Sequence, residues 1–517
     1  MAERVRLPAA WLADLAAQGQ GEDLAWEPSR LASLVEDRGA ARRLFAAAFQ
    51  VKLAEAQGHT RLALVGEDAP AWLGSFGPIP DTAALMSDPG LKGFVAEPGS
   101  MAPLIAGGGW IATGRAADEE RRIADAVRAR AAHRDPPREL DLPAGLNEEQ
   151  GNAVRLAAAS RLCLITGGPG TGKTSIIAAL LAALPGEKAL LAAPTGKAAQ
   201  RMGQSLTTAE APQTLHRLLG WHPRRGWRHH AGHPLDADLV IVDEASMVDQ
   251  ELMARLLDAL KPETRLVLLG DADQLPSVGS GAVLRDLVVA LPSVVAQLET
   301  SYRMIAEDPA GRAILGYAKQ VRSGVAEESD LPVCASVEAL AGKGAELLAP
   351  GALPELMKAW RARITALEGY EALVHMDHAC DAAGFDAASI SALRALMDHH
   401  DRFRLLALLQ EGPSLTGAAD LNAALHALAW PLNGRGLQRD LPFYLGEPVM
   451  MVRNDYSRGL FNGDQGLVVK VRREGASHRE VVFWKEGRPV AFPLGPLMPD
   501  LALAYALTVH KAQGSEF

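Results

Sequence analysis

Residues 167–174 read GGPGTGKT and match the phosphate-binding pattern G-x-x-x-x-G-K-[ST] in full. The flanks also fit, because residues 161–166 form an apolar run typical of a buried strand and residues 175–184 predict a helix. In such a loop, backbone N–H groups close around phosphates at a helix N-terminus. We therefore expect Lys173 to reach the β- and γ-phosphates of ATP and Thr174 to ligate Mg²⁺. The nucleotide-binding residues predicted from this loop are Gly167, Gly168, Pro169, Gly170, Thr171, Gly172, Lys173, Thr174 and Ser175.

Further apolar runs at 188–193, 238–242 and 265–269 predict more strands of a parallel sheet. Residues that follow parallel strands meet at one edge of the sheet, where ligands bind. Asp243 and Glu244 follow the second run, and we expect Asp243 to hold Mg²⁺ and Glu244 to take a proton from the attacking water. Gln274 follows the third run and can place an amide at the γ-phosphate.

Gln150 precedes the first strand and has two explanations. Its amide could pair with the edge of adenine, since it offers a donor and an acceptor together. It also lies in the first turn of a helix that Asn147 would cap, with acidic residues beside it. Both explanations can hold at once.

Small polar and basic residues at two strand–helix junctions are candidates for holding a nucleic-acid backbone. They are Thr195, Lys197 and His216. Residues 221–234, WHPRRGWRHHAGHP, add Arg224 and Arg225 at a turn with a tryptophan on either side. Cations for phosphates and rings for bases suit single-stranded nucleic acid. An exposed polar hairpin is the alternative.

Length and composition set the frame for these motifs. A chain of 517 residues predicts two to four domains. Without an 18-residue apolar run or a secretory signal, and with three scattered cysteines, the sequence predicts a cytoplasmic protein that does not cross a membrane. The net charge of −10 excludes a nonspecific polycation but not a local basic channel. His375, His378 and Cys380 lie close together, but they lack the second ligand pair of a zinc site.

Several segments together carry a resemblance to a known family. In order, they are GGPGTGKT, APTGKAAQRM, TLHRLLG, VDEASMVD, GDADQLPSVGSG, SYR, GEPVMMVRNDYSRGLFNGDQG and LAYALTVHKAQGSEF. This order and spacing resemble superfamily 1 DNA helicases, and within them the RecD family, the alpha subunits of bacterial exonuclease V complexes. The resemblance covers roughly residues 40–517 and is highly specific from residue 146 onward.

The resemblance implies an α/β fold with two RecA-like P-loop lobes built on parallel sheets, at residues 141–300 and 301–517. Residues 1–140 would form a small α/β or helical domain and linker that dock on a partner, and residues 446–497 an SH3-like β insertion in the second lobe. The runs 449–452, 466–471, 480–484 and 489–492 predict the strands of that insertion.

The resemblance also implies roles for residues of the second lobe. Arg303 would reach the γ-phosphate, although Met304 stands where the family usually has Gln. Further positions match family segments that line the nucleotide cleft or lie near DNA. Gln513, Gly514 and Glu516 match the cleft, and Thr508 and His510 match the DNA side.

The implied function is an ATP- and Mg²⁺-dependent DNA helicase and translocase that moves 5′ to 3′. It would join two larger subunits of the RecB and RecC type in double-strand break repair, with nuclease activity on a partner chain. Two alternatives remain: a stand-alone RecD-like helicase, which the short amino-terminal region argues against, and a DNA-sensing regulatory ATPase that does not unwind.

The position of the last residue adds one expectation. The chain ends directly after HKAQGSEF, where the family continues with a strand and a helix that bear a second arginine. We therefore expect a truncated second lobe. Because an arginine at the γ-phosphate contributes strongly to rate, we also expect slow ATP turnover by this chain alone.

Overall fold

The computed structural model describes residue 15 and residues 21–66, 68–73, 75–79, 81–136, 139–206, 211–300, 308–327, 331–412, 416–433, 442–455, 457–485 and 487–513. The chain divides into two compact units, residues 1–302 and 303–517.

A parallel sheet forms the centre of the first unit. Among its described residues, six strands pair in the order β10-β5-β9-β8-β6-β7, and every pair is parallel. The strands are β5 Leu162–Gly167, β6 Ala189–Ala193, β7 Gln213–Thr214, β8 Leu239–Val242, β9 Arg265–Gly270 and β10 Val295–Leu298. The four predicted apolar runs are β5, β6, β8 and β9, so the predicted α/β fold class is confirmed.

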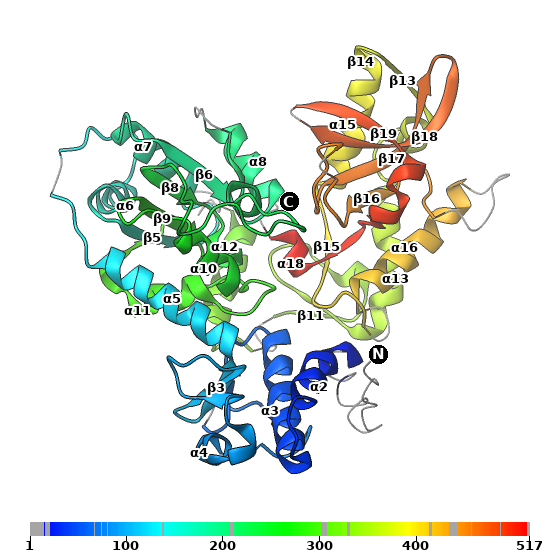
Figure 1. The fold of residues 1–517 in the computed structure, drawn as a ribbon. Coiled ribbons are helices and arrows are strands. Elements are labelled where there is room, and N and C mark those ends of the chain that lie inside the picture. Colours follow the sequence, from blue (N-terminus) through cyan, green and yellow to red (C-terminus); the bar gives the residue numbers. More distant parts are fainter. Residues whose placement is uncertain are drawn as a thin grey trace. The chain divides into compact units, whose positions relative to one another are not determined.

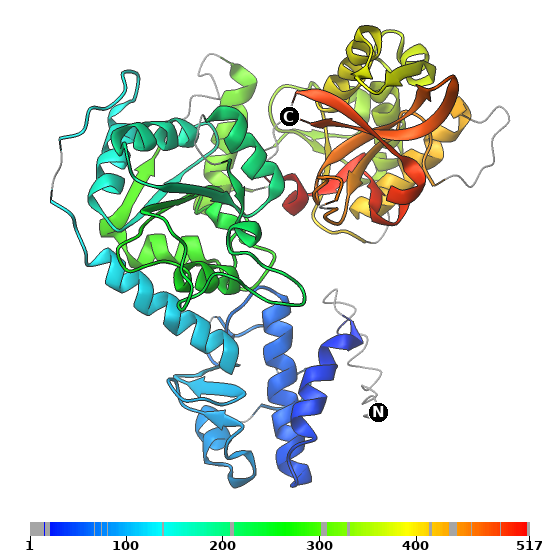
Figure 2. The same cartoon turned by 45° about the horizontal axis from the view of Figure 1, so that its top comes forward.

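Helices cover both faces of this sheet (Figures 1 and 2). Alternate residues of β5 show the division: Leu162 and Leu164 point into one core, while Cys163 and Ile165 point into the other. Because neither face meets water, these strands read as continuous apolar runs instead of alternating ones. The first core contains α5 Gly114–Ala131, α9 Leu215–Leu218, α10 Gln250–Asp258 and α11 Val283–Ala290; the second contains α6 Glu148–Ala159, α7 Lys173–Ala183 and α8 Gly196–Ser205.

The amino-terminal region of this unit packs helices against a small sheet of order β1-β4-β3-β2. Residues 104–107 and 110–113 pair as an antiparallel hairpin. Gly108 and Gly109 adopt φ values of 58° and 81°, which turn the chain back on itself. The elements are α2 Trp26–Ala32, α3 Arg38–Ala56, β1 Leu62–Ala63, α4 Thr82–Ser87, β2 Val95–Ala96, β3 Leu104–Gly107 and β4 Trp110–Thr113.

Helix α5 joins the small sheet to the large one (Figure 1). It begins directly after β4, and its Ile123 and Val127 are buried in the core of the parallel sheet. Near its end, the Arg130 guanidinium donates to the carbonyls of Thr264 at 2.6 Å and Lys261 at 2.9 Å. The helix is therefore part of the hydrophobic core of the parallel sheet as well as a connection between the two regions.

The second unit contains a mixed sheet of seven described strands. Five follow the path β14-β13-β17-β16-β20, while β18 pairs with β17 and β19 pairs with β18. The four predicted β runs of the insertion are β16 to β19, and their neighbours pair antiparallel. The SH3-like identity of this part stays a prediction. The strands are β13 Asp377–Asp381, β14 Gly384–Phe385, β16 Pro448–Met451, β17 Gln465–Arg473, β18 Ala476–Lys485, β19 Arg488–Pro493 and β20 Leu501–Leu503.

Beside this sheet, β15 Leu405–Ala407 and β21 Ala506–Thr508 form a parallel pair. β11 Val333–Cys334 and β12 Leu347–Leu348 form a second parallel pair. The helices of the unit are α12 Pro309–Ser323, α13 Leu353–Ile364, α14 Tyr370–His375, α15 Ala387–His400, α16 Ala418–Asn433, α17 Leu494–Leu497 and α18 Val509–Ala512.

A buried carboxylate lies where α5 packs on α10. Glu119 is 4% exposed and accepts a hydrogen bond from Gln250 Nε2 at 3.5 Å. Burial raises the pKa of Glu119, although the nearby Arg115 acts in the opposite direction. An acid whose pKa is higher in the folded chain than in the unfolded chain loses its stabilising contribution as pH rises through the folded pKa.

Glu119→Gln should therefore stabilise the protein at pH 8, because it removes a charge that burial disfavours and keeps an oxygen acceptor. We expect a rise in Tm of about 2–4 °C, which corresponds to roughly 1 kcal/mol, and the gain should shrink toward pH 4. Thermal unfolding across this pH range measures the effect, with Glu120→Gln, an exposed ion-pair partner of Arg61, as control. A lower Tm at both ends of the range would contradict the prediction.

Candidate functional site

The loop at 167–174 has the conformation that the motif predicts. Gly170 and Gly172 adopt φ values of 76° and 80°, and α7 begins at Lys173. The Lys173 ammonium donates to the carbonyls of Gly167 at 2.8 Å and Gly168 at 3.1 Å. The ammonium thus lies against the loop, and the loop N–H groups stand at a helix N-terminus, which suits a polyphosphate.

Gln150 supports the loop from behind. With Asn147 it forms a capping box at the start of α6, and its Nε2 donates to the Thr171 carbonyl at 3.0 Å. A Cβ atom at Gly172 would lie 2.4 Å from that nitrogen, so the close approach requires glycine. The predicted helix cap is confirmed, and a contact between Gln150 and adenine stays a prediction.

Asp243 and Glu244 follow β8 at the same edge of the sheet as the loop. The Glu244 N–H donates to Asp243 Oδ1 at 2.9 Å. Burial raises the pKa of both carboxyls, and the charge of Asp243 raises that of Glu244 further. The positive charges of Lys173 and Arg201 act in the opposite direction and favour the charged form of both groups.

The backbone of Glu244 is strained. Its φ of 53° and ψ of 38° are left-handed values that cost a non-glycine residue about 1–2 kcal/mol. Such strain gathers where a side chain must be aimed for function.

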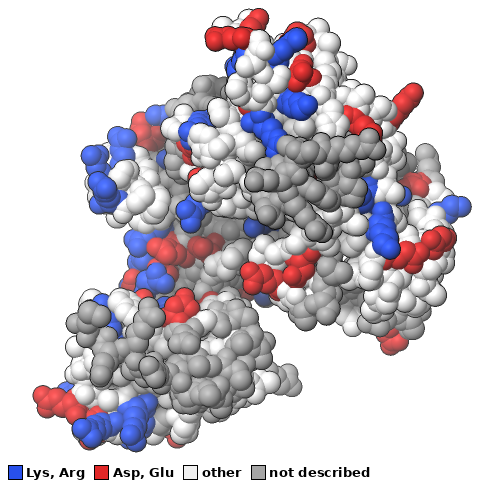
Figure 3. Space-filling model, turned by 90° about the vertical axis from the view of Figure 1, so that its right-hand side faces the viewer, with Lys and Arg blue, Asp and Glu red and all other residues white. Residues whose placement is uncertain are grey.

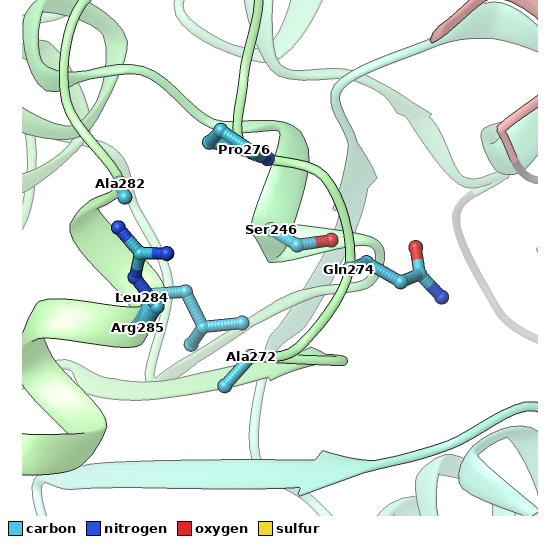
Figure 4. Close-up of a pocket in the computed structure, with 7 residues that line it drawn as sticks. All are labelled: Ser246, Ala272, Gln274, Pro276, Ala282, Leu284 and Arg285. Carbon is cyan, nitrogen blue, oxygen red and sulfur yellow. The ribbon is translucent and has the colours of Figure 1, made fainter. Parts of the chain in front are cut away.

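Gln274 lies in the segment 271–282 after β9, which we call the sensor loop. Asp271 is 4% exposed and accepts two hydrogen bonds from Gln274. The backbone N–H of Gln274 donates to the Asp271 carbonyl at 3.2 Å, and its side-chain Nε2 donates to Asp271 Oδ2 at 3.5 Å. The Ala272 N–H donates to Thr166 Oγ1 at 3.1 Å, which attaches the loop to the end of β5. Figure 4 shows the Gln274 side chain directed away from a small pocket that Ser246 and Arg285 line.

Sequence reasoning missed Asp271 and Arg201. Asp271 directly follows a buried strand, so the rule that selected Asp243 could also have selected it. Arg201 lies in α8, and no local pattern indicates that its charge acts on the two acids.

Two of the predicted DNA contacts cap helices. The hydroxyls of Thr195 and Thr508 accept from the N–H groups of Ala198 at 3.2 Å and Lys511 at 3.3 Å, at the starts of α8 and α18. Lys197 lies in the first turn of α8, and His510 lies in α18. Contacts of these four residues with DNA stay predictions.

The segment 221–234 is an exposed double turn with bridges between 222 and 226 and between 230 and 233. Arg224 and Arg225 are exposed at the first turn. Trp227 packs against the core of the parallel sheet. The ring centroids of His216 and Trp221 lie 5.5 and 6.3 Å from the ring centroid of Trp227. Trp221 is 44% exposed, so it, and not Trp227, can offer a ring to a base.

Charge is mixed on the face shown in Figure 3, where Lys and Arg side chains lie among Asp and Glu side chains.

Some predicted residues lie outside the described part of the chain: Arg303, Gly514 and Glu516. Gln513 is described and follows α18, where its N–H donates to the His510 carbonyl at 3.3 Å.

In the described ranges, no three or more His, Cys, Asp or Glu side chains gather as a metal cluster, and His378 is buried within β13. A Mg²⁺ site that uses one or two protein ligands and substrate phosphates does not require such a cluster. None of the described helices combines the length and apolarity needed to cross a bilayer.

The loop, the acid pair and the parallel sheet define a P-loop nucleotide-binding protein. A family model described as an AAA domain matches residues 150–280. The chain is 36% identical over 395 residues to the RecBCD enzyme subunit RecD of Mycolicibacterium smegmatis, covering 71% of this chain and 64% of that protein. It is 34% identical over 430 residues to the subunit of the same name from Mycobacterium tuberculosis, covering 77% of this chain and 68% of that protein.

The chain belongs to the RecD family, and it spans about two thirds of the length of these two relatives. It is also 34% identical over 378 residues to the ATP-dependent RecD2 DNA helicase of Deinococcus radiodurans, covering 72% of this chain and 44% of that protein. Among solved structures, it resembles Bacteroides Pif1 bound to ssDNA at 17% identity over 72% of this chain and 84% of that chain, with a TM-score of 0.36.

Proposed function

We propose that this protein is an ATP-driven DNA helicase and translocase that moves 5′ to 3′ as the RecD-type subunit of a helicase–nuclease complex. The observation that supports this most is one edge of the parallel sheet, where the phosphate loop with Lys173 follows β5 and the pair Asp243–Glu244 follows β8. The names of the curated relatives support the substrate class and the complex.

The residues of this edge divide the work of hydrolysis. The backbone of the phosphate loop and Lys173 would hold the triphosphate, and Thr174 and Asp243 would hold Mg²⁺. Bound Mg²⁺ neutralises charge on the phosphates. Glu244, whose backbone adopts the left-handed conformation described above, would accept a proton from the attacking water. The Gln274 amide would contact the γ-phosphate end of the nucleotide and sense its loss.

Replacing the loop lysine tests the assignment. Lys173→Gln should lower DNA-stimulated ATP hydrolysis by about 100-fold or more, since it removes a cation aimed at the reacting phosphates. The fold should persist, because backbone geometry shapes the loop. Lys188→Gln, which affects an exposed ion pair with Asp236, is the matched control. Normal turnover in Lys173→Gln would refute the site, and hydrolysis without strand separation in the wild type would favour the DNA-sensing regulatory ATPase.

The turn at 221–234 is proposed to contact DNA during unwinding. Replacing Arg224 and Arg225 with Ser, with both tryptophans left in place for packing, should slow unwinding roughly tenfold, because hydrogen bonds between charged groups are strong. ATPase stimulation by single-stranded DNA should change much less. The exposed pair Arg38 and Arg42, replaced in the same way, is the control. An equal loss of unwinding and stimulation would instead indicate a general DNA-binding role.

The amino-terminal region is proposed to dock on two larger subunits of the RecB and RecC type. It exposes Trp26 at 57% and Leu34 at 69% beside an apolar groove that α2 and α3 line. Exposed apolar surface of this kind is typical of protein interfaces.

Replacing Trp26 and Leu34 with Ser should therefore abolish co-purification with both subunits and leave DNA-stimulated ATP hydrolysis intact. Val289→Ser, at a position 78% exposed on α11, controls for loss of surface apolarity. Full complex formation by the double variant would contradict the docking surface.

A further inference from the structure

The second half of the sensor loop is held by the amino-terminal region. Ser280 Oγ donates to the Glu55 carbonyl at 2.9 Å, and the Gly281 N–H donates to the Gly58 carbonyl at 2.9 Å. Glu55 lies at the end of α3, and Gly58 follows that helix. Two backbone carbonyls from the front of the chain thus fix the loop that carries Gln274.

Gln250 attaches the same point of the loop to α5. It is 5% exposed and begins α10, six residues after Glu244. Its N–H donates to the Ser280 carbonyl at 3.0 Å, and its Nε2 donates to the Ala116 carbonyl at 2.7 Å. One residue therefore joins the sensor loop, through its backbone N–H, to α5, through its side chain.

A hydrogen bond between α3 and α5 closes this set of contacts into a ring. Thr113 Oγ1 lies 2.5 Å from Glu55 Oε1 and caps α5 by accepting from the Ala116 N–H at 3.3 Å. We call this closed set the hydrogen-bond ring. Its members are Glu55, Thr113, Ala116, Gln250 and Ser280.

The glycines of the loop leave little room for it to shift. A Cβ atom at Gly279 would lie 2.3 Å from Asp249 Oδ2. Gly281 has a φ of 97°, and a Cβ atom there would lie 3.1 Å from Thr60 Cγ2 and 3.2 Å from Gln250 Cβ. Ser277 Oγ braces the turn by donating to the carbonyls of Gly279 and Gly281 at 2.9 and 3.0 Å.

Gln274 therefore lies between two fixed points, the bond from Ala272 to Thr166 and the hydrogen-bond ring. We propose that the ring makes the amino-terminal region part of the hydrolysis machinery, with Ser280 as a positioning residue that acts through Gln274. This inference rests on the proposed ATP hydrolysis. A displacement of about 1 Å in a group that meets the reacting phosphate can cost up to about 10²-fold in rate.

Ser280→Ala in the full chain should lower kcat of DNA-stimulated ATP hydrolysis about 3- to 10-fold, as expected for one lost hydrogen bond. KM for ATP and the Kd of a fluorescent ATP analogue should not change, because the phosphate loop is untouched. Ser280→Thr, which keeps the hydroxyl, should retain the wild-type kcat. Ser87→Ala is the matched control, since it removes a serine hydrogen bond to a backbone carbonyl, that of Ala84 at 3.3 Å, in the same region.

A double-mutant cycle separates positioning from a purely structural role. In a Gln274→Ala background, Ser280→Ala should change kcat by less than about twofold, because the group that it positions is already gone. The same fold-loss in both backgrounds would overturn the proposal, as would a parallel loss of nucleotide affinity and Tm in Ser280→Ala. A wild-type chain without DNA-stimulated hydrolysis would instead refute the proposed function.

Discussion

The first unit depends on the burial of a parallel sheet on both faces. The central strands are buried on both faces, and the polar side chains within them, Thr166 and Arg265, lie at or next to a strand end. Parallel direction brings those ends to one edge. The phosphate loop, the acid pair and the sensor loop are neighbours because β5, β8 and β9 are adjacent in the sheet. Chemistry at this edge is therefore a consequence of how the core is packed.

The same edge concentrates charge that the fold must tolerate. Two adjacent carboxyls with raised pKa values lie near Lys173 and Arg201, and the backbone at Glu244 is strained. Removing carboxylates from water, even in part, disfavours their charged form and so destabilises a fold. In the second unit, by contrast, the buried acid Glu447 has several partners: it lies within hydrogen-bond distance of His426 and accepts from Tyr505 and the Tyr444 N–H.

Sequence reasoning succeeded where a structure is encoded locally. The glycine spacing at 167–174, the apolar runs and the acids at 243–244 each carry their signal within a few residues, and the structure confirms their placement. The packing of Trp227 and the hydrogen-bond ring could not be predicted from the sequence, because they join segments that are far apart along the chain. Neither hydrophobic periodicity nor a local motif indicates such contacts. The roles of the second-unit residues came from family resemblance alone.

Two members of the hydrogen-bond ring, Glu55 and Ser280, lie far apart in the sequence, and this affects how the chain folds during synthesis. Ser280 and Glu55 are separated by 225 positions. A ribosome that adds about 5–20 residues per second needs roughly 10–45 s to make that stretch. During this interval the carbonyls of Glu55 and Gly58 have no partner from the sensor loop. The apolar face of α5 at Ile123 and Val127 also stays exposed until the sheet that covers it has been synthesised. The nascent chain must therefore stay soluble with an unfinished surface until α10 and β9 emerge, and the sensor loop is among the last parts of the first unit to take its final form.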